Sequence, residues 1–278
     1  MKNYIRVPYA KSVHGSNEIR AVVDVLNKST QMGKNVELFE KKVSKLFNKK
    51  YGLMVNSGSS ALLLAIESLN LSSGSEVITP VLTFSTTISY LIKNNLKPIF
   101  VDVKKDTFCI NEDKIVNAIN KKTKVILAPN LIGNLVDWKK IKRITRNKNI
   151  IVIEDSADTL GSKINNKSSG YFTDISTTSF YGSHIINCAG NGGMVCYNNL
   201  NYYKKAKLLR SWGRSSSLFK DSEKIENRFN IKLDGIDYDK KFVFEEIGHN
   251  LEPSEIGAAF GLEQLKKLTK NIKLRQKY

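Results

Sequence analysis

The chain has 278 residues, 41% of them hydrophobic and 25% charged, which suits a globular protein with a sizeable core. The formal net charge is +18, but the lysines are spread along the whole chain and no zinc-finger or aromatic–basic RNA motif accompanies them, so nucleic-acid binding is disfavoured. The N-terminus lacks the apolar segment of a signal peptide, and the most apolar stretch, 77–91, is interrupted by Thr, Ser and Pro. We therefore expect a cytoplasmic protein without a membrane span.

Helical and strand-like segments alternate along the chain. Apolar spacing predicts helices over 16–29, 36–48, 57–69, 85–95, 110–119, 138–148 and 254–278, and strands over 51–56, 76–80, 97–103, 123–130 and 149–156. This alternation indicates an α/β domain with a mostly parallel sheet, in which ligands bind at the carboxyl ends of the strands. The last helix is apolar on one face and needs a partner to cover that face.

Three strand ends carry candidate chemistry. Residues 56–60 (NSGSS) form a glycine–serine turn that opens a helix, a possible anion site or simply a helix cap. Residues 154–158 (EDSAD) deliver carboxylates from a buried strand, and either Glu154 or Asp155 must face a site. Such a carboxylate suits a metal or a protonated pyridine nitrogen. Residues 179–193 combine hydroxyls, His184 and flexible glycines.

The three cysteines, Cys109, Cys188 and Cys196, form no CxxC pair. We expect buried thiols in a reducing compartment, with no disulfide scaffold and no structural metal site.

Taken together, NSGSSAL, PVLTFSTT, EDSADTLGS, SFYGSH, GNGGMV and GHNLEPSEIGAAFGLEQL resemble the DegT/DnrJ/EryC1/StrS family of sugar aminotransferases and dehydratases. The resemblance runs from about residue 9 to the last residue. It implies the aspartate-aminotransferase fold (PLP fold type I), pyridoxal or pyridoxamine phosphate (PLP or PMP) as cofactor, and a homodimer with active sites at the subunit interface. It also implies a large domain over 1–233 and the start of an incomplete small C-terminal domain over 234–278, because family members continue well beyond this point.

The resemblance assigns roles to individual positions. Phosphate contacts are implied for Gly58, Ser59 and Ser179, and Asn250 matches an asparagine that reaches the phosphate in the neighbouring subunit. Phe84 matches the aromatic residue that stacks on the pyridine ring, and Asp155 the carboxylate that pairs with the ring nitrogen. Asp158 stands near the ring hydroxyl, where aminotransferases of the family commonly have glutamine. His249 departs from the family's usual tyrosine.

The most informative departure is His184, which occupies the position of the lysine that forms the internal Schiff base in the aminotransferases. Imidazole has no primary amine, and no lysine lies between Lys167 and Lys204. The same replacement marks the branch that resembles 3-dehydratases of nucleotide-linked 4-keto-6-deoxyhexoses. In that reading His184 moves protons near neutral pH while the cofactor is held non-covalently.

The resemblance thus implies C3 dehydration of a nucleotide-linked keto sugar in surface polysaccharide biosynthesis, with an amino donor such as glutamate regenerating PMP. The region 210–229 contains no cysteine, which disfavours an iron–sulfur cluster. A sugar aminotransferase is the nearest alternative, and a non-catalytic homologue that binds PLP or a sugar nucleotide is the second.

Overall fold

The computed structural model describes residues 5, 11, 13–219, 224–229 and 231–277. The α-helices are α1 (Ser16–Leu26), α2 (Lys34–Leu46), α3 (Gly58–Glu67), α4 (Ser85–Lys93), α5 (Glu112–Ala118), α6 (Trp138–Ile144), α7 (Leu200–Arg210), α8 (Ile225–Arg228) and α9 (Glu255–Lys277). The strands are β1 (Tyr51–Val55), β2 (Glu76–Pro80), β3 (Lys97–Val101), β4 (Thr123–Pro129), β5 (Ile151–Asp155), β6 (Lys163–Ile164), β7 (Lys167–Ser168), β8 (Ile175–Ser179), β9 (Gly193–Tyr197), β10 (Ile231–Leu233) and β11 (Ile236–Tyr238). Short 3-10 turns cover Leu131–Gly133, Ser169–Phe172, Ser215–Leu218 and Lys240–Phe242.

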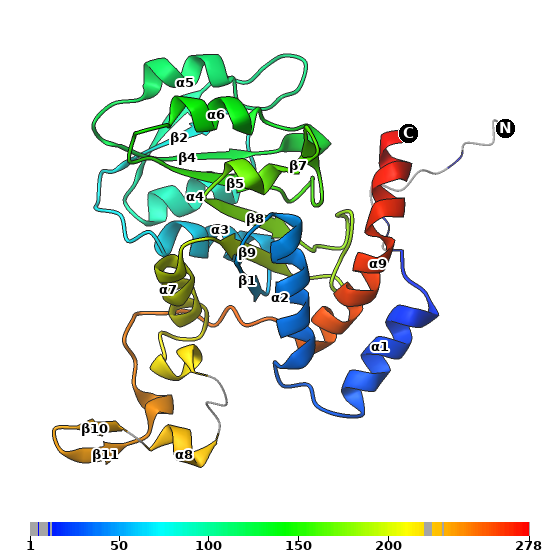
Figure 1. The fold of residues 1–278 in the computed structure, drawn as a ribbon, viewed down its shortest axis with the longest axis vertical. Helices are drawn as coiled ribbons and strands as arrows, with labels where there is room; N and C mark the ends of the chain where they lie inside the picture. The colour runs from blue at the N-terminus through cyan, green and yellow to red at the C-terminus, as the bar shows by residue number, and fades with distance from the viewer. Residues whose placement is uncertain (1–4, 6–10, 12, 220–223, 230, 278) are drawn as a thin grey trace.

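A seven-stranded sheet with the order β1-β9-β8-β5-β4-β2-β3 forms the centre of the molecule (Figure 1). β9 pairs antiparallel with both β1 and β8, and the other neighbouring pairs are parallel. The predicted α/β class with a mostly parallel sheet is therefore confirmed. The carboxyl ends of β1, β5 and β8 lie at the same edge of the sheet, as the site prediction requires.

Successive residues of each strand point to opposite faces of the sheet. On β5, Ile153 joins the apolar cluster under α3 and α7, whereas Val152 joins the cluster under α5 and α6. On β1, Met54 joins a third cluster with α2 and α9. The sheet is thus covered on both faces, which explains why its central strands read as continuous apolar runs.

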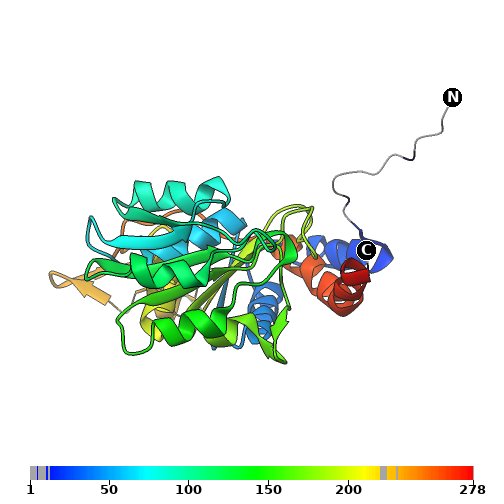
Figure 2. The ribbon, with the colours of Figure 1, turned by 90° about the horizontal axis from the view of Figure 1, so that it is seen from above.

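The final helix, α9, is covered by the two N-terminal helices. Figures 1 and 2 agree that α1 lies against α9 to one side of the sheet. The carboxylate of Glu255 accepts hydrogen bonds from the N–H groups of Gly33, Asn35 and Val36, so the start of α9 caps the start of α2. The predicted need for a cover on the apolar face of this helix is met by α1 and α2. The domain boundary at residue 234 stays a prediction.

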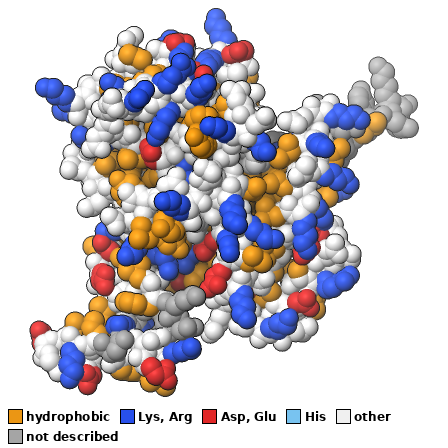
Figure 3. All heavy atoms as spheres, viewed as in Figure 1, with side chains coloured by type: hydrophobic (Ala, Val, Ile, Leu, Met, Phe, Trp, Pro, Cys, Tyr) orange, Lys and Arg blue, Asp and Glu red, His pale blue; other side chains and the backbone are white. Residues whose placement is uncertain are grey.

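The surface has two further features. In Figure 1 the β10–β11 hairpin projects from the body of the molecule, and in Figure 3 Lys and Arg side chains are scattered over the viewed face rather than gathered in one patch. Among the described helices, none combines the length and apolarity that a bilayer crossing requires. All three cysteines are buried and free, as expected.

Candidate active site

The start of α3 forms an anion cradle at the end of β1. The Ser57 hydroxyl caps the helix by accepting from the Ser60 N–H at 3.0 Å, and the Ser60 hydroxyl donates to Asn56 Oδ1 at 2.6 Å. The cap takes the Ser60 N–H, which leaves the N–H groups of Gly58 and Ser59 facing outward from the positive end of the helix. Such a turn can hold a phosphate.

Two glycines allow this cradle to pack closely against the neighbouring strands. A Cβ on Gly58 would lie 2.5 Å from the Cβ of Ser179, and a Cβ on Gly193 would lie 2.1 Å from the carbonyl oxygen of Ser57. In the sheet Gly193 is opposite both Val55 and Ser179. The structure therefore brings Gly58 and Ser59 together with Ser179, which lies more than a hundred residues further along the chain.

The two carboxylates at the end of β5 face opposite ways. Asp155 lies on the same face of β5 as Ile153, towards α3, and is 8% exposed. Glu154 is fully buried on the other face, where the hydroxyls of Ser176 and Ser156 donate to it. Buried hydroxyls therefore satisfy Glu154, and Asp155 is the member of the pair that points towards the cradle side of the sheet.

Burial sets the electrostatics of Asp155. Loss of hydration raises its pKa to about 6, although the Ala157 N–H donates to Oδ1 at 3.1 Å and opposes the rise. The nearby Asp158 charge raises the pKa further, and His184 lowers it. A buried carboxyl of this kind is still ionised at neutral pH and gains from a cationic partner.

His184 and Asp158 lie side by side, close enough to Asp155 for their charges to affect it. The distance from His184 Nδ1 to Asp158 Oδ1 is 3.5 Å, long for a hydrogen bond but close enough for an ion pair. Asp158 Oδ2 also accepts from the Ile132 N–H at 3.0 Å. The neighbouring imidazole is the main cause that lowers the pKa of Asp158, against the effect of burial. Both side chains reach solvent, with 19% of His184 and 37% of Asp158 exposed.

Phe84 occupies the position directly before the first residue of α4. Its side chain is 65% exposed, which is unusual for so large an apolar ring. The first turn of α4 lies beside the cradle, since the hydroxyls of Ser59 and Thr86 are 3.5 Å apart. An exposed ring beside an anion cradle offers a face on which a flat ligand can stack.

Asn250 is exposed, and its backbone bridges to Ser211. The adjoining Leu251 carbonyl accepts from the Asn56 N–H at 3.1 Å, which ties this segment to the end of β1. The neighbouring His249 contacts Glu67 of α3 at 2.8 Å, so the residue that departs from the family pattern is held by the same helix that forms the cradle. The role of Asn250 towards a second subunit stays a prediction.

Some neighbours of the site were missed by sequence reasoning. Thr86 is one, and Asn130 is another: its N–H donates to the Asp155 carbonyl and its amide donates to Ser156 Oγ. Asn130 directly follows β4, the strand adjacent to β5, so its place in the chain was a usable signal. Thr86 gave none, because threonine near a helix start usually serves the helix alone.

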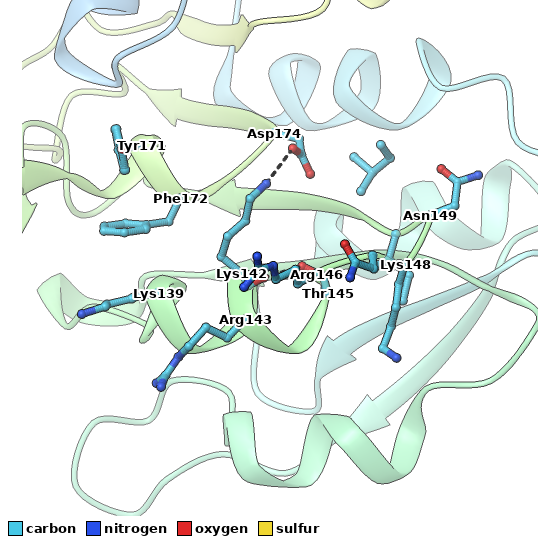
Figure 4. A pocket seen from close by; sticks show the side chains of 13 residues that line it. Lys139, Lys142, Arg143, Thr145, Arg146, Lys148, Asn149, Tyr171, Phe172 and Asp174 are labelled. Atoms are coloured by element: carbon cyan, nitrogen blue, oxygen red, sulfur yellow. Dashed lines mark hydrogen bonds and ion pairs between the residues drawn. The ribbon is translucent and has the colours of Figure 1, made fainter.

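The hollow shown in Figure 4 lies elsewhere. It is lined by α6, the start of β5 and the turn at 171–174, with Lys142 paired to Asp174 at 3.4 Å. These residues lie at the amino end of β5, whereas Asp155 ends the strand. The basic hollow is therefore separate from the candidate site.

Comparison with known proteins agrees with this geometry. Residues 13–278 match the DegT/DnrJ/EryC1/StrS aminotransferase family. The GDP-4-keto-6-deoxy-D-mannose 3-dehydratase of Yersinia pseudotuberculosis is 35% identical over 283 residues, covering 99% of this chain and 70% of the relative.

Two solved structures extend the likeness to three dimensions. The E. coli GDP-4-keto-6-deoxy-D-mannose 3-dehydratase with bound hydrated PLP has a TM-score of 0.89 and 33% identity, covering 98% of this chain and 70% of that one. A GDP-4-keto-6-deoxymannose 3-dehydratase with a trapped PLP–glutamate geminal diamine has a TM-score of 0.85 and 32% identity, covering 95% and 69%. The predicted PLP aminotransferase-like fold is thus confirmed. The chain belongs to the DegT/DnrJ/EryC1/StrS family, which includes PLP-dependent sugar 3-dehydratases and aminotransferases.

Proposed function

We propose that this protein is a PLP/PMP-dependent enzyme that removes the C3 hydroxyl of a nucleotide-linked 4-keto-6-deoxy sugar. The observation that carries the proposal is His184, paired with Asp158 and adjacent to the buried Asp155 at the carboxyl edge of the sheet. A histidine at this place can move protons but cannot bind the cofactor covalently.

The residues around the site fit this cofactor. The α3 N-terminus, with Gly58, Ser59 and Ser179, would hold the phosphate. Asp155 would face the ring nitrogen, because a buried carboxylate with a raised pKa gains most from a cationic partner. The exposed Phe84 ring would cover one face of the pyridine.

When bound, the cofactor supplies an amine for the C4 ketone and a ring that accepts electrons. His184 would take the proton from the cofactor's C4′ carbon and return a proton to the departing C3 hydroxyl. Asp158 would orient the imidazole through Nδ1, which leaves Nε2 for the reacting atoms. Asp155 would keep the ring nitrogen protonated while the electrons move.

The relatives suggest which substrate and which amino donor to test first. GDP-4-keto-6-deoxymannose is the first substrate to test, since the printed name of the Yersinia relative specifies it. Glutamate is the first amino donor, since a solved relative holds a PLP–glutamate adduct. We also propose a homodimer in which Asn250 serves the neighbouring site, and a role in surface polysaccharide biosynthesis.

The decisive variant is His184→Asn, assayed for dehydration of GDP-4-keto-6-deoxymannose with PLP and glutamate. We expect turnover to fall at least about a hundredfold, the lower end for loss of a general base, with PLP binding retained. His14→Asn is the matched control, because His14 lies beside Phe260 of α9, outside the site. Full dehydration by His184→Asn would overturn the assigned role.

Product analysis separates the remaining alternatives. A dehydratase releases a sugar without its C3 hydroxyl, whereas an aminotransferase releases an amino sugar that keeps it. An absorbance spectrum with added PLP, taken before and after glutamate, tests the non-catalytic alternative. Conversion of a free-aldehyde band to the PMP band supports the donor half-reaction, and absence of PLP binding contradicts an active site in this chain.

A further inference from the structure

We propose that α9 is a positioning element for His184, acting through Asn271 and Arg275. The inference rests on the proposed function of His184 as the proton carrier of the site. It adds two residues that lie outside the cofactor contacts and outside the motifs that identify the family.

The two side chains bind the backbone on either side of His184. Asn271 Nδ2 donates to the Ile185 carbonyl at 3.0 Å, and Arg275 Nη2 donates to the Ser183 carbonyl at 3.2 Å. The two donors are four residues apart and therefore share one face of the helix. Helix α9 thus holds the peptide unit directly before the histidine and the unit that joins Ile185 to Ile186.

The contact continues along the helix towards its start. A Cβ on Gly257 would lie 3.1 Å from the Cys188 carbonyl oxygen, and a Cβ on Gly261 would lie 2.6 Å from Cys188 Sγ. The segment 183–188 therefore follows α9 from the glycines near its N-terminus to Arg275 near its C-terminus. Small residues allow close approach at one end, and polar side chains hold the backbone at the other.

The same face of α9 also supports the loop that carries Asp158. Gly161 has φ +83°, and a Cβ there would lie 3.2 Å from atoms of both Leu268 and Ile272. The charge of Arg275 adds to the main effect of His184 in lowering the pKa of Asp158. One helix therefore sets the positions of both members of the His184–Asp158 pair.

Such support is needed because the segment around His184 forms neither helix nor strand. Its backbone hydrogen bonds close a turn, from the His184 N–H to the Tyr181 carbonyl at 3.0 Å, and tie the ends of the segment together, from the Cys188 N–H to the Phe180 carbonyl at 3.1 Å. A catalytic side chain on an irregular segment depends on surrounding contacts for its place. A displacement of about 1 Å can lower a rate on the order of a hundredfold.

The test compares Asn271→Leu, Arg275→Gln and Lys270→Ala with His184→Asn in the dehydration assay with GDP-4-keto-6-deoxymannose, PLP and glutamate. Leucine matches the size of asparagine without a donor, and Lys270 is an exposed residue on the same helix. We expect Asn271→Leu and Arg275→Gln each to lower kcat about ten- to a hundredfold while KM, PLP affinity and the unfolding midpoint stay unchanged. Lys270→Ala should match the parent protein.

The pH profile distinguishes positioning from general damage. Arg275→Gln removes a positive charge near Asp158 and so should raise the pKa of that carboxyl. The acid limb of the plot of kcat against pH should then move to higher pH, whereas Asn271→Leu should leave the limb in place. If Asn271→Leu lowers the unfolding midpoint, Asn271→Ser, which keeps a donor, should restore both stability and part of kcat. Parent-like kcat in Asn271→Leu and Arg275→Gln, with His184→Asn inactive, would refute the inference alone. Full activity of His184→Asn would refute the proposed function and the inference with it.

Discussion

Gly58 and Ser179 meet so closely that a Cβ on the glycine would stand 2.5 Å from the Cβ of the serine. The first turn of α3 can approach the end of β8 only because residue 58 lacks a side chain. This contact joins the helix N-terminus to the hydroxyl of Ser179, and so it builds the proposed phosphate cradle from two distant parts of the chain.

We predict that Gly58→Ala destabilises the protein by about 1–3 kcal/mol, the usual cost of overpacking, and weakens PLP binding. Adding Ser179→Gly removes the clashing Cβ, so the double variant should regain stability without regaining PLP affinity. Denaturant unfolding and PLP titration measure the two effects. Gly182→Ala is the control, since a Cβ there meets nothing within 4 Å. If the double variant loses the sum of the stabilities that the two single variants lose, the clash between the two Cβ atoms is contradicted.

We predict that Asp155→Asn stabilises the cofactor-free protein near neutral pH. Because the pKa of Asp155 is raised from 3.8 to about 6, the folded chain holds a proton that the unfolded chain releases between these values. Stability therefore falls as the pH rises through this window, and the loss is complete above about pH 6. The variant should gain about 3 kcal/mol at neutral pH and nothing near pH 3.5.

Denaturant unfolding at both pH values, with and without PLP, checks this prediction. PLP should stabilise the parent protein more than Asp155→Asn, because the asparagine offers no charge to the ring nitrogen. Glu154→Gln is the matched control: its carboxylate accepts hydrogen bonds from several buried hydroxyls, so the change should destabilise the protein. A loss of stability in Asp155→Asn at neutral pH would show that the site itself holds a partner for the carboxylate.

Much of the site could be predicted because parallel strands place their carboxyl ends together. The ends of β1 and β5 follow apolar runs that stop at polar residues, whereas the end of β8 was marked only by its hydroxyls, His184 and glycines. The sheet order confirms that the three ends converge. Strand alternation alone could not choose between Glu154 and Asp155, because it shows that the two side chains point to opposite faces but not which face carries the site. Only the family resemblance assigned Asp155. The antiparallel insertion of β9 between β1 and β8 also left no local signal.

The contacts of α9 were beyond prediction for a different reason. Asn271 and Arg275 lie 86 and 92 residues from the carbonyls that they bind. On the helix they look like ordinary polar surface residues, and only the path of the backbone at 183–188 gives them a role. Hydrogen bonds from side chains to distant backbone carry no periodicity that a sequence pattern could reveal.

We predict that Phe84→Ala separates cofactor affinity from stability. The ring is 65% exposed, so its removal should change the free energy of unfolding by less than about 1 kcal/mol, while loss of a stacking partner weakens PLP binding about three- to tenfold. Phe180→Ala is the contrast, because that ring is fully buried against Phe39 and its loss should cost about 3–5 kcal/mol. PLP titration and denaturant unfolding of both variants check this, and unchanged PLP affinity in Phe84→Ala would remove the stacking role.

We predict that Asp158→Asn lowers turnover about ten- to a hundredfold with little change in stability. Asparagine keeps an oxygen near His184 Nδ1 but removes the carboxylate charge from the His184–Asp158 pair, so the imidazole is oriented less firmly for proton transfer. Because the pKa of Asp158 lies below its ordinary value, the carboxylate of the parent protein is ionised across the whole neutral range, and the defect should persist there at every pH. The carboxyl group is 37% exposed, which is why stability should change by less than about 0.5 kcal/mol. Dehydration kinetics from pH 6 to 9 measure the effect, with the exposed Asp24→Asn on α1 as the control. Parent-like turnover of Asp158→Asn across this range would mean that His184 is oriented by the α9 contacts to its backbone alone, and that the carboxylate beside it serves the cofactor or the fold.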